Sequence, residues 1–127
     1  MRRLAVVLWV SLNAAWLAGL AHRAVKAGYR GCGMTNAVVE YPAEDNPARL
    51  VAQQNKHELR RRLAELARRM GARDPDALGD GLLLLIEGAY VSSHLFGPGG
   101  PARIVADAAD ALIGAYLTSN GLPASAT

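Results

Sequence analysis

The chain of 127 residues contains one cysteine, one phenylalanine and only 6% aromatic residues. The single cysteine, Cys32, excludes an internal disulfide and a Cys-x-x-Cys metal or redox site. One cysteine fits a reducing compartment as well as export. Apolar residues nevertheless make up 51% of the chain, and alanine and leucine carry most of that content. This composition favours helices over a β-sandwich, which is typically rich in β-branched and aromatic residues.

An excess of charge of one sign is also lacking. Fourteen basic residues against eleven acidic ones leave a net charge of +3. This value is far below the dense positive charge of a dedicated nucleic-acid binder. The apolar content excludes a disordered chain, and the length suits one domain with one core. We expect that domain over residues 1–121, with a frayed tail over residues 122–127.

Glycine and proline divide the sequence into about five helical pieces, which predicts an all-α bundle. Asn46-Pro47 and Asp74-Pro75 are helix start signals, since each pair places a capping side chain before a first-turn proline. Gly71 is a typical C-terminal glycine. The expected helices cover residues 2–27, 34–41, 47–70, 75–96 and 101–120.

The first piece allows two interpretations. Residues 4–21 are uncharged and long enough to span a membrane, and two arginines before them with small residues behind them are typical of a signal peptide. The same segment has helical apolar spacing that suits a buried helix of a bundle, carried by Trp9, Leu12, Trp16 and Leu20. The residues alone leave both readings open.

No catalytic or metal-binding motif is present, so we expect neither an enzyme nor a bound cofactor. The sequence has no Gly-x-Ser-x-Gly, no phosphate-binding glycine loop and no His-Glu-x-x-His. His22, His57 and His94 are isolated from one another along the chain. Cys32 follows Arg30 closely and is either a redox-sensitive thiol of lowered pKa or a small apolar residue at a tight turn.

The arginines of the long third piece resemble a nucleic-acid patch but are better explained as a solvated face. Three consecutive arginines, residues 60–62, fan out around a helix and do not form one surface. Glu58 and Glu65 alternate with the arginines and place Glu58–Arg62 and Glu65–Arg69 at i,i+4.

Two groups of polar residues interrupt otherwise apolar helices. Gln53, Gln54 and His57 occupy positions where the apolar stripe of their helix should continue upstream. Glu87, Tyr90 and His94 are spaced i, i+3 and i+7 and therefore share one helix face. Each group either lines a ligand cavity, where a ligand or water satisfies the polar atoms, or faces solvent.

The run of five apolar residues at 82–86 covers nearly every face of its helix. One domain core covers one face, so the rest predicts a second contact, most simply another subunit. The last piece carries a stripe of small and apolar residues that permits close helix–helix approach.

An ordered series of segments resembles the C-terminal half of TetR/AcrR-family transcriptional regulators. The series begins with Gly-Cys-Gly-Met-Thr-Asn-Ala-Val-Val-Glu-Tyr-Pro at residues 31–42 and continues through Asp-Asn-Pro at 45–47 and the long arginine-rich helix. It ends with Gly-Ala-Arg-Asp-Pro-Asp-Ala-Leu at 71–78, Leu-Leu-Leu-Leu-Ile-Glu-Gly-Ala at 82–89 and the helix at 101–116. The match covers residues 28–116.

The resemblance implies a cytoplasmic, homodimeric effector-binding domain whose last two helices pack against those of a second copy. By position, the dimer interface would involve Leu84, Ile104, Ala108, Leu112 and Ala115. The cavity for a small apolar or amphipathic effector would involve Trp9, Trp16, Met34, Asn36, Gln53, Gln54, His57 and Tyr90.

One departure from the family is clear. Family members begin with a DNA-binding helix-turn-helix, and this sequence carries none. We therefore expect DNA contact only through a head absent from this chain, and we assign that role to no residue. The resemblance favours a buried first helix without membrane association. The alternative is a small membrane-anchored or exported helical protein that uses residues 4–21 as a span or signal peptide.

Overall fold

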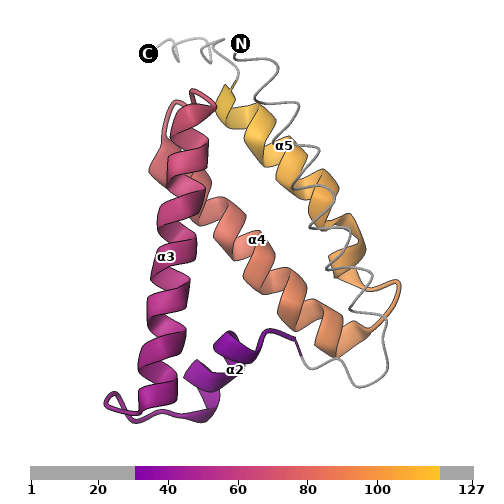
Figure 1. Ribbon diagram of the computed structural model, residues 1–127. Coiled ribbons are helices and arrows are strands. Elements are labelled where there is room, and N and C mark those ends of the chain that lie inside the picture. The colour runs from indigo at the N-terminus through magenta and orange to yellow at the C-terminus, as the bar shows by residue number, and fades with distance from the viewer. Residues whose placement is uncertain (1–30, 118–127) are drawn as a thin grey trace, which may run out of the picture.

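The computed structural model describes residues 31–117, and within that range every regular element is helical (Figure 1). The elements are α2 (Gly33–Glu40), α3 (Pro47–Arg69), α4 (Pro75–Phe96), the short 3₁₀ helix η1 (Pro101–Ile104) and α5 (Val105–Leu117). The predicted all-α class is thereby confirmed. The expected first helix and the expected tail lie outside the described residues.

The predicted start and stop signals act as expected. The Asn46 side chain accepts hydrogen bonds from the backbone N–H groups of Ala48 (2.9 Å) and Arg49 (3.4 Å) at the start of α3. Asp74 accepts from Ala77 N–H at 3.0 Å and caps α4. Gly71, after the end of α3, has a φ of 80°, a left-handed conformation that favours glycine.

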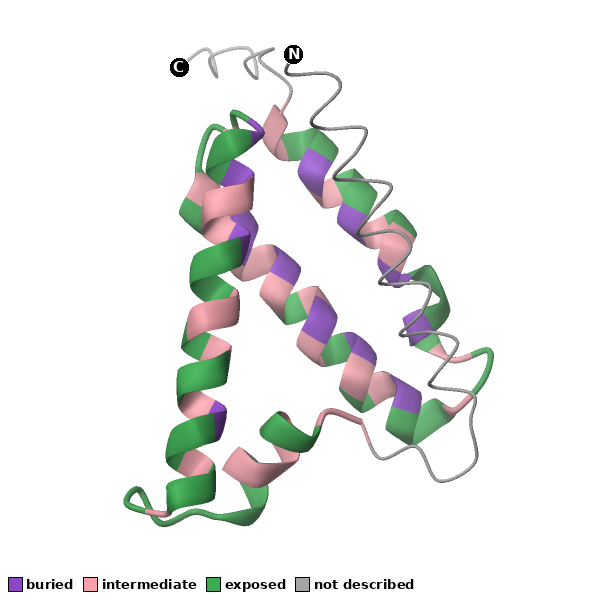
Figure 2. Ribbon diagram, in the orientation of Figure 1, coloured by how far each residue is buried: buried purple, intermediate pink, exposed green. Residues whose placement is uncertain are grey.

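Helix α4 is the central element, with α3 on one side and α5 on the other (Figure 1). Helix α2 lies near the N-terminal end of α3 and the C-terminal part of α4. The buried residues lie along the inward faces of these helices (Figure 2). The core contains Leu63 and Ala67 from α3 and Met70 directly after it, Leu78, Leu82, Ile86 and Ala89 from α4, and Ala102, Val105, Ala109 and Ile113 from η1 and α5.

The α3–α4 crossing depends on Gly79. A methyl group added at Gly79 would lie 2.8 Å from the backbone nitrogen of Ala64 and 2.9 Å from its Cα. Backbone therefore packs against backbone at this point, and no larger residue fits without moving a helix. This close contact sets the spacing of the two helices that carry the polar cluster described below.

The last helical piece differs from its prediction in two ways. It opens with the 3₁₀ helix η1, a frequent start for an α-helix, before α5 begins at Val105. Its buried face is formed by Val105, Ala109 and Ile113, one step around the helix from the predicted stripe. The cause is the packing of α5 on α4, which sequence spacing alone does not determine.

None of the helices described between residues 31 and 117 is long and apolar enough to cross a membrane. Residues 4–21, the segment predicted either as a span or as a buried helix, lie outside the described residues.

Candidate functional site

A polar cluster lies where α2, α3 and α4 meet. The Lys56 ammonium on α3 forms an ion pair with Glu87 on α4, and it also donates a hydrogen bond to the Cys32 sulfur at 3.4 Å. The hydroxyl of Thr35, on α2, donates to the other Glu87 carboxylate oxygen at 2.6 Å. Four side chains from three helices thus form one hydrogen-bonded group, the Cys32–Lys56 cluster.

Local backbone structure brings Cys32 to this cluster. Gly31 has a φ of 81°, and an added Cβ there would contact the Tyr90 carbonyl oxygen at 3.4 Å. The chain therefore passes close to α4 just before Cys32, which is the N-cap residue of α2. At the other end of α2, the Arg49 guanidinium donates to the carbonyl oxygens of Val38 (2.7 Å) and Tyr41 (3.3 Å). These bonds hold α2 against α3.

The surroundings of Lys56 favour its charged form. Burial lowers the pKa of this amine, but the hydrogen bond and charge of Glu87, with a smaller contribution from Cys32, outweigh burial and raise the pKa above its usual value. The ammonium also lies 5.7 Å from the centre of the Tyr90 ring, within the range of a cation–π contact. Lys56 is therefore a fixed positive charge beside the sulfur.

The surroundings of Cys32 lower the pKa of its thiol, whereas those of Lys56 raise the pKa of the amine. Burial raises its pKa, but hydrogen bonds from Thr35, the charge of Lys56 and the backbone N–H of Met34 together lower the pKa below its usual value. The Thr35 hydroxyl carries one proton, so it donates either to Glu87, as in this structure, or to the sulfur. Arg30, the neighbour that suggested a lowered pKa in the sequence, lies outside the described residues, and Lys56 supplies the charge.

Two hollows border the cluster, and Cys32 lines both. The first, the α2–α4 cavity, has a volume of about 260 Å³. It is lined by Gly31, Cys32, Thr35, Asn36, Val39, Glu40, Tyr90, Val91, His94 and Leu95. The second is a more open hollow of about 560 Å³ between α2 and α3, where Met34, Ala37 and Val51 form most of an apolar wall.

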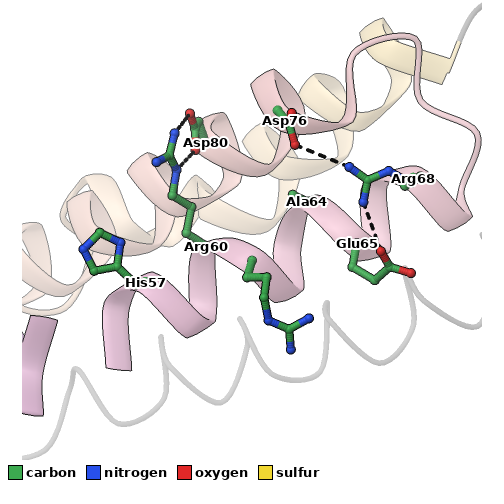
Figure 3. A pocket seen from close by; sticks show the side chains of 8 residues that line it. His57, Arg60, Ala64, Glu65, Arg68, Asp76 and Asp80 are labelled. Carbon is green, nitrogen blue, oxygen red and sulfur yellow. Dashed lines mark hydrogen bonds and ion pairs between the residues drawn. The ribbon is translucent and has the colours of Figure 1, made fainter. Parts of the chain in front are cut away.

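A third hollow, of about 450 Å³, lies between α3 and α4 and is lined by charged side chains (Figure 3). Arg60 makes two hydrogen bonds to Asp80, at 2.5 and 2.7 Å, and Arg68 pairs with Glu65 and Asp76. The predicted pairs Glu58–Arg62 and Glu65–Arg69 also form. Carboxylates thus pair with the arginines at 60–62 and 68–69, as expected of a solvated face.

The arginine pairs also act on the acids. Hydrogen bonds from Arg61 and Arg62 lower the pKa of Glu58 to about 2. The side chain of this glutamate is 42% exposed, so solvent screens the interaction and the pair adds little to stability. The charged hollow is therefore a surface feature and a weaker candidate for recognition than the Cys32–Lys56 cluster.

The structure separates the predicted cavity residues into three places. Asn36 and Tyr90 line the α2–α4 cavity, and Met34 lines the hollow on the other side of Cys32. His57 is exposed in the arginine hollow. Gln53 is half-buried and Gln54 is exposed, and neither lines these three hollows. Trp9 and Trp16 lie outside the described residues.

The face shared by Glu87, Tyr90 and His94 turns toward α2. Glu87 joins the cluster, whereas Tyr90 and His94 line the α2–α4 cavity. Of the two interpretations of this face, the structure favours a pocket wall. Sequence reasoning missed Lys56 because it lies among polar residues of α3 and its partner is 31 positions away.

The outer face of α4 is apolar and exposed in the part of the chain that the structure describes. Leu84, Val91 and Leu95 are 73, 49 and 68% exposed, and together with Gly88 they are spaced i, i+4, i+7 and i+11. None of these four residues carries a charged group. We call this the α4 outer stripe.

The other predicted interface residues divide between surface and core. Ile104 is 50% exposed and Ala115 is exposed. Ala108 is half-buried. Leu112 is half-buried against the core, and a Cβ at Gly81 would lie 2.8 Å from one of its methyl groups. Leu112 therefore packs within its own subunit.

Residues 31–117 contain no group of three or more His, Cys, Asp or Glu side chains placed to hold a metal ion. Comparisons of the chain with protein-family models, with curated proteins and with solved structures find no match.

Proposed function

We propose that this chain is the ligand-sensing and dimerisation domain of a cytoplasmic TetR/AcrR-like transcriptional regulator. The observation that supports the proposal is that Val91 and Leu95 belong to two features at once. Both line the α2–α4 cavity, and both lie on the α4 outer stripe. A molecule in the cavity and a second subunit on the stripe would therefore act on the same two turns of α4.

The cavity suits a small amphipathic molecule. Its volume of about 260 Å³ is near the lower end of typical ligand pockets. Val39, Val91 and Leu95 offer apolar contacts. Polar groups come from other lining residues, among them Cys32, Thr35 and Tyr90. An apolar body with one polar end fits this division.

A second copy is the occupant that suits the α4 outer stripe. A soluble helix normally has charged residues on its solvent face, and this stripe has none. Covering a leucine or valine completely stabilises an assembly by roughly 1.5–3 kcal/mol. A single helix face is also self-complementary about a two-fold axis, because each residue meets its counterpart or near neighbour on the other copy.

The proposed mechanism is a shift between two arrangements of α4. A ligand that fits one arrangement better would favour it, and the partner subunit would respond because the same helix forms the interface. In a regulator with DNA-reading heads, that response would change the spacing of the heads and hence their match to two half-sites.

The test is a titration with the amphipathic dye anilinonaphthalene sulfonate, followed by fluorescence and by sedimentation velocity. We expect one saturable dye site per subunit and a dimer whose dissociation constant changes when the dye is bound. Val39→Trp, at an exposed position on the cavity mouth, should weaken dye binding by at least about tenfold, the effect of losing roughly 1.4 kcal/mol.

Leu50→Trp is the matched control, because Leu50 is an exposed apolar residue that lines none of the three hollows. It should leave dye affinity unchanged. Equal loss of affinity in both variants would show that the dye does not bind in the α2–α4 cavity. A wild-type monomer at micromolar concentration would remove the dimer.

A further inference from the structure

We propose that Cys32 is a covalent capture site for small α,β-unsaturated carbonyl compounds that enter the α2–α4 cavity, with the Lys56 ammonium facing its sulfur. This inference rests on the proposed ligand-sensing function and deepens it, since it names a chemical class of ligand for the same cavity. The geometry that supports it is a sulfur held in a polar cluster and also lining a cavity wall.

The sulfur is placed as a nucleophile and not as a core group. A structural cysteine is normally surrounded by apolar side chains. Here the Lys56 ammonium lies 3.4 Å away, and Glu87 fixes that ammonium from α4. The side chain is half-buried, so water and small solutes reach it through the hollows on either side.

The cavity adds selectivity to this reactivity. The walls beyond the sulfur are mainly apolar, so they favour compounds with a short hydrocarbon body. The Lys56 ammonium does not line the cavity, but it lies 3.4 Å from the sulfur that does, so it can attract negative charge that develops close to the sulfur during the reaction. A conjugated enone has these two parts, an apolar body and a carbonyl that becomes an enolate.

The step is a conjugate addition that balances without an oxidant. Cys32 gives its proton to solvent, and the sulfur lone pair forms a bond to the β-carbon of the compound. The carbon–carbon π pair shifts toward the carbonyl oxygen, which gives an enolate. The α-carbon then takes a proton from solvent, the carbonyl re-forms, and no group leaves.

The adduct would alter the cluster. The thioether sulfur carries no charge, so Lys56 would lose its thiolate partner and keep its contacts with Glu87 and the Tyr90 ring. The added carbon atoms would stay between α2 and α4, where they contact the residues that the cavity shares with the α4 outer stripe.

The experiment treats the full chain with cyclohexenone and follows the adduct by intact-mass spectrometry. We expect one adduct per chain, absent in Cys32→Ser, and a rate that saturates as the cyclohexenone concentration rises. Saturation shows that the compound binds before it reacts. Glutathione under the same conditions provides the reference for an unassisted thiol.

Four variants separate the role of the cluster from the role of the cavity. Lys56→Met should slow the reaction severalfold at neutral pH, because loss of the ammonium raises the pKa of the thiol and lowers the thiolate fraction. Lys56→Arg keeps the charge and should retain most of the rate. Circular dichroism checks that both Lys56 variants are folded. Val39→Trp should abolish saturation, whereas Leu50→Trp should not.

A rate that rises linearly with concentration and equals that of glutathione would overturn the proposal. Equal rates in folded Lys56→Met and wild-type protein would remove Lys56 from it. The dye titration and the sedimentation measurement keep the two proposals apart. Saturable capture by a monomer without a dye site would refute the regulator and retain the covalent site. A dimer with a saturable dye site whose Cys32 reacts no faster than glutathione would refute the covalent site and retain the regulator.

Discussion

Replacing Gly79 by alanine is the sharpest test of how α3 and α4 meet. The new methyl group would lie 2.8 Å from the Ala64 nitrogen, where ordinary contacts begin at 3.4 Å. The blocking atoms are backbone, which cannot rotate away as a side chain can. The helices must therefore move apart by about 0.6 Å, and the buried residues on either side lose contact as they do.

Two opposing effects determine the change in the free energy of unfolding. Alanine is better than glycine inside a helix by roughly 1 kcal/mol. Overpacking a tight core costs about 1–3 kcal/mol, and the upper end applies where backbone is the obstacle. We expect Gly79→Ala to lower the stability by about 1–2 kcal/mol, which corresponds to a melting temperature lower by roughly 4 °C or more.

Gly88→Ala is the matched control in the same helix, because a Cβ there meets no atom within 4 Å. It should stabilise the isolated subunit by up to about 1 kcal/mol. Since Gly88 lies on the α4 outer stripe, the melts are compared over a series of protein concentrations. Equal stabilisation by both substitutions would refute the close crossing at Gly79.

The remaining predictions concern the proposed interface and the thiol. Leu84→Arg should convert the dimer to a folded monomer in sedimentation, whereas Leu112→Arg should also lower the melting temperature of the subunit, because Leu112 packs on its own core. A folded Leu84→Arg dimer would contradict the proposed interface. The pKa of Cys32 lies below its usual 9.0, so this group stabilises the fold at high pH and loses that contribution as pH falls through the folded value. The stability difference between wild type and Cys32→Ser should rise with pH below 9.0 and level off above it. In Lys56→Met the ammonium no longer offsets the effect of burial on the pKa of Cys32, so thiolate absorbance should appear at higher pH than in the wild type. An unchanged titration would show that Lys56 has no influence on the Cys32 pKa.

The starts of α3 and α4 and the end of α3 were predictable because they depend on local chemistry. Asn46 and Asp74 cap helices through hydrogen bonds to residues two or three positions away, and proline follows each cap. Gly71 ends α3 through its own backbone conformation. Such signals lie within a few residues of the feature they specify, so they can be read without knowing the fold.

The cluster was harder to predict because it joins residues that are distant in sequence. The face of Glu87 and Tyr90 follows from helical spacing, which is local. The choice of Lys56 as the partner of Glu87 depends on the angle and depth of the α3–α4 crossing, and Gly79 and Ala64 set that crossing. A glycine inside a helix indicates a close contact, but it does not indicate which helix packs against it.

Helix α4 links these observations. Its N-terminal half is held in the core by Leu78, Gly79 and Leu82, so this half can move only if α3 moves with it. Its C-terminal half carries the cluster residue Glu87, the α4 residues of the cavity and most of the α4 outer stripe. Beyond Ile86 its buried face contains only the small residues Ala89 and Ser93. The N-terminal half therefore acts as an anchor, and displacement by a ligand is expected in the turns that contact both the cavity and a second subunit.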